Sequence, residues 1–154
     1  MNETVQRRLE VEGCDFTVHR HQALISAQEF KAHLPFDPEA MVKTLVFRLP
    51  DGGYALAVLR AFARLDYKKL ADALGVRRAD LRAAEPDDVA HDLGFDIGGV
   101  CPITDLAAAK VLIDPNVGDL GKVYCGTGRN TSTLEIAAED LIRISGGALA
   151  TISK

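Results

Sequence analysis

The chain has 154 residues, of which 47% are hydrophobic and 26% charged, and this size and composition predict one globular domain over residues 1–154. Its net charge of −4 argues against an indiscriminate nucleic-acid binder, and no apolar run approaches the ~20 residues of a membrane-spanning helix. Three widely spaced cysteines, with no Cys-x-x-Cys pair and no His/Cys cluster, argue against a disulfide framework or a zinc site. We therefore expect a cytoplasmic protein with no metal, no cofactor, no DNA partner and no membrane contact.

The first predicted elements are two helices, a helical turn and a hairpin. A capping box of the form S-x-x-E predicts a helix over 26–33, and an Asp-Pro pair predicts a helical turn at 37–38. Two apolar runs, 42–49 and 54–60, predict antiparallel strands because the turn sequence PDGG separates them. An aspartate cap and a terminal glycine then predict a helix over 66–74.

The second half of the chain predicts two helices and three short strands. Glu-Pro at its start and a glycine after its end mark a helix over 85–93. Short strands are expected at 110–114, 122–125 and 133–136, and a closing helix at 137–145. Hairpins mixed with helices indicate an α+β fold with a mixed sheet rather than a βαβ array.

Lys43 lies at the start of the predicted strand 42–49, in phase with its apolar face. Because side chains alternate along a strand, Lys43 shares a face with Leu45, Phe47 and Leu49. One interpretation is a surface lysine whose stem runs along the core while its ammonium reaches water. The other is a cation at the mouth of a pocket, and the strand alone does not decide between them.

The segment 94–103, with the sequence GFDIGGVCPI, is the most unusual in the chain. Gly98 and Gly99 permit a positive φ and a close approach of ligand to backbone, and Pro102 stiffens the far end. Such a loop can aim several N–H groups at one oxygen, as an oxyanion hole requires. A tight crossover loop without a ligand has the same composition, so both interpretations stay open.

Residues 60–82 carry seven basic and three acidic side chains, an excess that the rest of the chain does not share. Such a run usually forms a solvated face. The alternative is a patch that contacts phosphates.

Four motifs in order suggest a family: MVKTLVF, GGVCP, VLID and CGTGR. Together with the N-terminal VHRHQALISAQEF, they resemble the YbaK and prolyl-tRNA-synthetase-associated editing domains over residues 18–144. That family hydrolyses wrongly charged aminoacyl-tRNA. The resemblance implies a free-standing deacylase for a small amino acid on tRNA-Pro or a similar tRNA, with an aminoacyl-tRNA synthetase as a further candidate partner. It also implies a curved, mixed, mainly antiparallel sheet wrapped by helices.

The resemblance also implies which residues form the site, between the lysine-bearing strand and the glycine–proline loop. Lys43 would hold the ribose and terminal phosphate of the tRNA acceptor end, and Gly98 belongs to the loop that polarises the ester carbonyl. The implied substrate-binding residues are His21, Ser26, Thr44, Gly99, Val100, Cys101, Pro102, Asp114 and Gly126. Outside the pocket, Lys69, Arg77 and Arg78 are expected to contact tRNA phosphates.

The sequence departs from the family pattern at three places. Cys101 stands where many relatives have serine, residues 114–116 read Asp-Pro-Asn instead of D-x-S, and residues 126–128 read Gly-Thr-Gly instead of Gly-Gly. These departures bear on which amino acid is accepted and leave the family resemblance standing.

Two other functions fit the same residues. Cys101 could act as a thiol nucleophile with one of the four histidines as its base, although a lone apolar cysteine is more often inert packing. A non-catalytic module that binds a tRNA end or a small metabolite would also fit the net negative charge.

Overall fold

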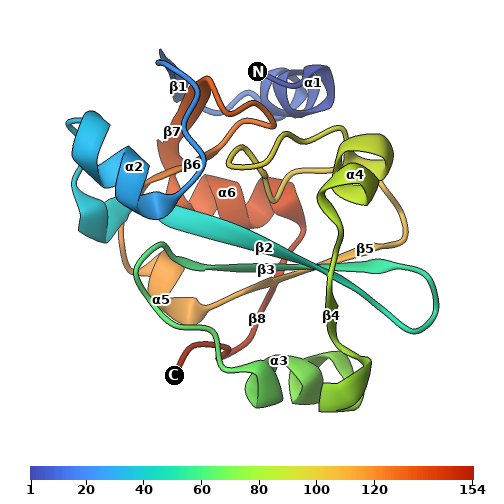
Figure 1. Cartoon of the computed structure of the whole chain (residues 1–154). Coiled ribbons are helices and arrows are strands. Elements are labelled where there is room, and N and C mark those ends of the chain that lie inside the picture. Colours follow the sequence, from blue (N-terminus) through green and yellow to red (C-terminus); the bar gives the residue numbers. More distant parts are fainter.

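The computed structural model describes all residues, 1–154, and contains two sheets with helices around them (Figure 1). The three-stranded sheet has the order β1-β7-β6, and the five-stranded sheet has the order β4-β2-β3-β5-β8. The strands are β1 (Phe16–Arg20), β2 (Val42–Arg48), β3 (Tyr54–Arg60), β4 (Arg82–Ala83), β5 (Ala109–Ile113), β6 (Lys122–Gly126), β7 (Ser132–Ala137) and β8 (Ala148–Leu149).

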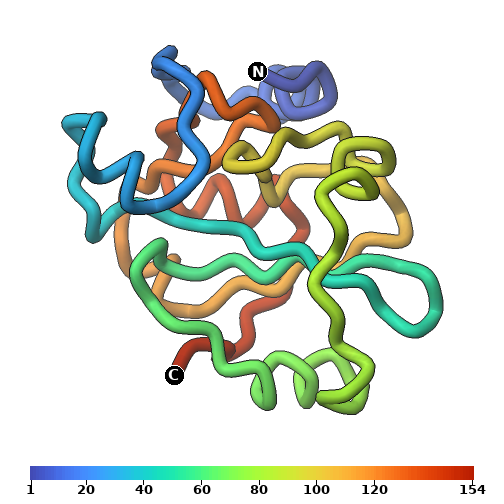
Figure 2. The backbone as a smooth tube through the Cα atoms, in the orientation of Figure 1, coloured from blue at the N-terminus to red at the C-terminus, as the bar shows by residue number.

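Most helices are short, and none is long and apolar enough to cross a membrane. The helices are α1 (Glu3–Glu12), α2 (Ala27–His33), α3 (Tyr67–Leu74), α4 (Pro86–Asp88), α5 (Pro115–Gly118) and α6 (Ala138–Ser145), with 3-10 turns at Pro38–Ala40 and Arg78–Asp80 and a π-helical turn at Val89–Leu93. The path of the chain in Figure 2 begins beside the three-stranded sheet and ends on the side of α3.

The predicted α+β fold is confirmed, but the strands divide between two sheets. β2 and β3 form the expected antiparallel hairpin, with Lys43 opposite Leu59. The three-stranded sheet is antiparallel throughout, whereas β5 pairs in parallel with both β3 and β8. An isolated parallel bridge between Met41 and Tyr124 joins the start of β2 to β6, and this bridge is the seam between the two sheets.

Two hydrophobic clusters lie on the two faces of the five-stranded sheet. The larger one is formed by one face of β3 together with side chains from α1, β6, β7 and α6. The smaller one lies on the side of α3 and includes Phe47 and Leu49 of β2 and its extension. Since Lys43 is in phase with Phe47, its side chain leaves β2 on this second face, as the alternation predicts.

The predicted helix signals are found where the sequence indicated them. The Ser26 hydroxyl accepts a hydrogen bond from the Glu29 N–H at 3.1 Å, and the Asp66 carboxylate accepts one from the Lys69 N–H at 3.1 Å. Gly75 ends α3 with a φ of 71°. Five elements were not predicted from the sequence: α1, β1, β4, α5 and β8. The segment predicted as one helix over 85–93 is instead a short α-helix followed by a π-helical turn.

Candidate functional site

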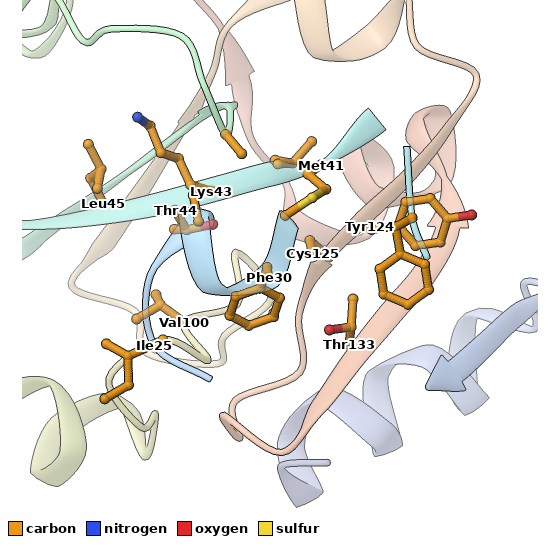
Figure 3. Close-up of a pocket in the computed structure, with 16 residues that line it drawn as sticks. Ile25, Phe30, Met41, Lys43, Thr44, Leu45, Val100, Tyr124, Cys125 and Thr133 are labelled. Atoms are coloured by element: carbon orange, nitrogen blue, oxygen red, sulfur yellow. The ribbon is translucent and has the colours of Figure 1, made fainter. Parts of the chain in front are cut away.

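A cavity of about 280 Å³ lies at the seam between the two sheets (Figure 3). It is bounded by β2, β6, β7, the segment that includes α2, and the loop that follows the π-helical turn. Eleven of its 16 lining residues are hydrophobic, and none is an aspartate or glutamate. The residues labelled in Figure 3 are Ile25, Phe30, Met41, Lys43, Thr44, Leu45, Val100, Tyr124, Cys125 and Thr133.

The glycine–proline loop forms one wall of this cavity, and glycines hold it against its neighbours. Gly98 has a φ of 82°, and a Cβ atom there would lie 2.5 Å from the Ile25 Cα atom. A Cβ atom on Gly126 would lie 2.2 Å from the Val100 carbonyl oxygen. The expectation that Gly98 leaves room for the substrate is therefore corrected, because the backbone of residues 24–25 fills that space.

Hydrogen bonds fix the loop further and leave some of its donors unused. The Gly128 N–H donates to the Gly99 carbonyl at 2.7 Å, and the Gly99 N–H donates to the Asp96 carbonyl at 3.0 Å. The N–H groups of Gly98 and Val100, both residues that line the cavity, donate to no acceptor in the chain. A rigid loop with unused donors beside a cavity is suited to stabilising negative charge on an oxygen.

Lys43 lies at the rim of the cavity with its ammonium held by the loop after β3. The Lys43 Nζ atom donates to the Ala63 carbonyl oxygen at 2.7 Å. Burial lowers the pKa of the Lys43 ammonium below its ordinary value. In Figure 3 the nitrogen points away from Thr44 and from the aromatic end of the cavity. Its stem thus follows apolar surface, as a snorkelling lysine does, and its charge lies at the mouth.

His21 and Ser26 support the cavity without lining it. The His21 Nδ1 atom lies 2.7 Å from the Gln22 carbonyl oxygen, which only accepts, so Nδ1 carries the proton. The Nε2 atom lies 2.8 Å from the Thr133 Oγ1 atom, and in the neutral ring it accepts the Thr133 hydroxyl proton. Ser26 caps α2, which presents Phe30 to the cavity.

The far end of the cavity is an aromatic wall that the sequence analysis missed. The rings of Phe36 and Tyr124 are stacked, with centroids 4.2 Å apart and planes 10° from parallel. His19 contacts the edge of Phe36 at 4.8 Å between centroids. These residues come from separate segments of the chain and share no local motif, so only the tertiary fold brings them together.

Cys101 is fully buried and does not line the cavity, although its neighbour Cys125 does. A hydrogen bond with Cys101 and complete burial raise the pKa of the Cys125 thiol well above its ordinary value. No histidine forms a hydrogen bond with either thiol. Because a nucleophilic cysteine needs exposure and a thiolate-favouring partner, the geometry argues against the thiol-hydrolase alternative.

The Asp114 carboxylate accepts hydrogen bonds from the protein backbone, and the residue does not line the cavity. Its carboxylate is 2% exposed and accepts hydrogen bonds from the N–H groups of Asn116, Ile152 and Ser153 at 2.9–3.1 Å. Burial alone would raise the pKa of Asp114, but these donors hold the pKa below its ordinary value. Asp114 therefore anchors the C-terminal segment instead of binding in the pocket. Gly99 and Pro102 also stand outside the lining.

The basic residues expected to contact tRNA lie on and after α3, which Figure 1 shows across the five-stranded sheet from α2. The Lys69 ammonium donates to the Ser153 carbonyl at 3.1 Å, and Arg77 forms two hydrogen bonds with Asp80 at 2.8 and 2.9 Å. The Arg78 guanidinium lies 4.4 Å from the centroid of the Tyr67 ring. These three residues do not join the cavity.

Comparison with known proteins gives one family match. The model of the aminoacyl-tRNA editing domain matches residues 21–144. The "Uncharacterized protein YwhH" of Bacillus subtilis (strain 168) is 28% identical over 105 residues, which are 68% of this chain and 65% of that protein. The chain therefore spans less than two thirds of this curated relative.

Solved structures give the same fold. The structure of "hypothetical protein APE2540" is 25% identical, has a TM-score of 0.86 and covers 99% of this chain and 100% of its own. A structure described as that of "a putative trans-editing enzyme for prolyl tRNA synthetase" is 23% identical, with a TM-score of 0.83 and coverage of 100% and 99%. At this identity the second likeness shows the fold alone.

Proposed function

Because the chain belongs to the aminoacyl-tRNA editing domain family, we propose that it hydrolyses the ester between a wrongly attached amino acid and the 3′ end of a tRNA. The observation that carries this proposal is the seam cavity, which is lined both by Lys43 and by two loop residues whose backbone N–H groups are unused. In this proposal residues 1–154 act as one editing domain, with mischarged tRNA as substrate and an aminoacyl-tRNA synthetase as a source of it.

Lys43 is proposed to hold the ribose and terminal phosphate of the acceptor end. Its ammonium uses one N–H for the Ala63 carbonyl, which leaves two donors for phosphate oxygens. As a compact point charge, lysine suits a phosphate without demanding one geometry. Burial lowers the pKa of Lys43 in the free protein, and an anionic partner would raise it again.

The loop is proposed to stabilise the transition state. With the ester carbonyl oxygen against the N–H groups of Gly98 and Val100, water attacks the carbonyl carbon and the oxygen takes up negative charge. The bond between that carbon and the ribose oxygen then breaks, and the ribose oxygen receives the proton that water gives up. An aminoacyl ester is already activated, so positioning and oxyanion stabilisation are sufficient and no protein nucleophile is needed.

The lining of the cavity favours a small amino acid. A space of about 280 Å³ must hold the aminoacyl group next to the ribose, and its walls are mainly apolar. Because apolar pockets separate substrates by only about 1–3 kcal/mol per methylene, neighbouring small amino acids would be accepted together. A small amino acid on tRNA-Pro or a similar tRNA is the substrate class proposed.

The test is a panel of mischarged tRNAs incubated with the purified protein and scored for released amino acid. Release from one or a few small-residue esters above the spontaneous rate supports the proposal. Tight binding of charged tRNA with no release would instead support the non-catalytic module that the sequence also allows.

A further inference from the structure

Phe62 is an exposed aromatic residue at the mouth of the cavity. Its side chain is 40% exposed, in the turn that follows β3. Both of its chain neighbours belong to the mouth, because Ala61 lines the cavity and the Ala63 carbonyl holds the Lys43 ammonium. The exposed part of the Phe62 ring can therefore meet a ligand that binds at the mouth.

Lys31 brings a second cation to the same place from the other side of the mouth. It lies on α2, the helix that presents Phe30 to the cavity, and its Nζ atom lies over the Phe62 ring in a cation–π contact, 5.5 Å from the ring centroid. Neither Lys31 nor Lys43 forms a salt bridge with a carboxylate, whereas the nearby Arg60 is paired with Glu39. The mouth thus combines one exposed ring with two positive charges that have no carboxylate partner.

This combination is typical of surfaces that bind unpaired nucleotides. A base stacks on an exposed aromatic ring whatever its identity, and an adjacent cation neutralises the phosphate. The 3′ end of a tRNA is single-stranded and offers both groups next to the ester. A double-stranded stem offers no free base, so it would not use the ring.

We propose that Phe62 and Lys31 form a nucleotide-binding subsite at the mouth, in which the Phe62 ring stacks on an unpaired base of the tRNA 3′ end and Lys31 contacts the phosphate beside it. The identity of this ligand rests on the proposed deacylase function. The subsite places the acceptor end across the gap between α2 and the turn after β3, so that the terminal ester enters the cavity beside Lys43.

The experiment measures binding of a fluorescently labelled single-stranded RNA, 5′-ACCA-3′, by anisotropy at several salt concentrations. Substituting Phe62→Leu keeps apolar bulk but removes the aromatic face, and we expect binding to weaken about tenfold. Phe62→Trp keeps a stacking face and should bind like the wild type. Because Phe62 is partly exposed, neither change should unfold the protein, which thermal melting checks.

Lys31→Gln tests the cation, with Lys110→Gln as the matched control. Lys110 is exposed on β5, opposite Ala55 and therefore at the other end of β3 from the mouth. Loss of one phosphate contact should lower the salt slope of binding by about 0.7 for a single strand. Only the Lys31 variant should show this change.

The results separate the subsite from the deacylase proposal. Equal binding by wild type and Phe62→Leu, or equally weak binding by Phe62→Leu and Phe62→Trp, would overturn the subsite. Equal affinity of the wild type for a blunt RNA duplex would overturn it as well. If the binding pattern holds but the wild type releases no amino acid from any charged tRNA, the subsite stands and the deacylase proposal fails. In an active enzyme, Phe62→Leu should raise KM for charged tRNA with kcat unchanged.

Discussion

Replacing Gly98 with alanine tests whether the shape of the glycine–proline loop governs the site. Gly98 has a φ of 82°, and an added Cβ atom would lie 2.5 Å from both the Ile25 Cα atom and the Leu24 carbonyl oxygen. The left-handed conformation costs a residue with a Cβ atom about 1–2 kcal/mol, and overpacking costs about 1–3 kcal/mol more. We therefore expect Gly98→Ala to lower the free energy of unfolding by about 2–5 kcal/mol.

Gly75→Ala is the matched control for this substitution. Gly75 ends α3 with a φ of 71°, and an added Cβ atom there meets nothing within 4 Å. Gly75→Ala should lower the free energy of unfolding only by the cost of the left-handed conformation, about 1–2 kcal/mol, and deacylation should stay normal. Urea unfolding of both variants isolates the contribution of the contact with residues 24–25.

The activity of Gly98→Ala connects the loop to the chemistry. Relief of the clash must move the loop or the segment at 24–25, which shifts the donors of Gly98 and Val100 from the proposed position of the carbonyl oxygen. Removal of one such donor typically lowers kcat by about 10²–10³, and we expect a loss of that size below the melting temperature of the variant. Normal kcat in a folded Gly98→Ala, or a stability loss no larger than that of Gly75→Ala, would refute this reasoning.

Four further predictions follow from the same structure. Lys43→Ala should remove most deacylation and leave the melting temperature nearly unchanged; near-normal turnover would contradict the proposed role of its charge. Cys101→Ser should keep most activity, since the residue is fully buried outside the cavity lining. An inactive but folded variant would support Cys101 as a thiol nucleophile. Thr44→Val should be at least as stable as the wild type, because the Thr44 hydroxyl is buried without a hydrogen-bond partner; destabilisation by more than about 1 kcal/mol in urea unfolding would show a missed partner. Reversing the charges of Arg77 and Arg78 should raise KM for charged tRNA and flatten its salt dependence at constant kcat, and an unchanged KM would leave the basic run at 60–82 as a solvated face.

Local signals in the sequence predicted the elements that depend on local contacts. Three signals each act within a few residues, so the local sequence is enough to predict them: the Ser26 cap, the PDGG turn and the glycine after α3. α1 and β1 were missed for different reasons. α1 has local signals that were not recognised, since the Asn2 side chain caps its first turn and Gly13 ends it with a φ of 66°. β1 pairs with β7, more than 100 residues away, and such pairing leaves no local pattern.

Of the residues that the family resemblance implied, five line one cavity: Lys43, Thr44, Gly98, Val100 and Gly126. Asp114 and Cys101 do not. Asp114 followed the expected motif, yet three backbone donors use its carboxylate to anchor the C-terminal segment. Cys101 lies in the expected loop, yet the loop turns that side chain into the core. A motif fixes the order of residues along the chain, whereas the direction of each side chain depends on neighbours that the motif does not contain.

Under the proposed function, the parts of the site that perform the chemistry differ from those that select the amino acid. The loop is held by backbone contacts, with Gly98 against residues 24–25, Gly126 against Val100 and the Gly128 N–H on the Gly99 carbonyl. Side chains such as Ile25 and Phe30 line the cavity without taking part in those contacts. Substitutions in the lining can therefore change cavity volume while the donors stay in place. Specificity should follow the apolar lining, and the departure at Cys101 should affect it little, because that side chain never reaches the cavity.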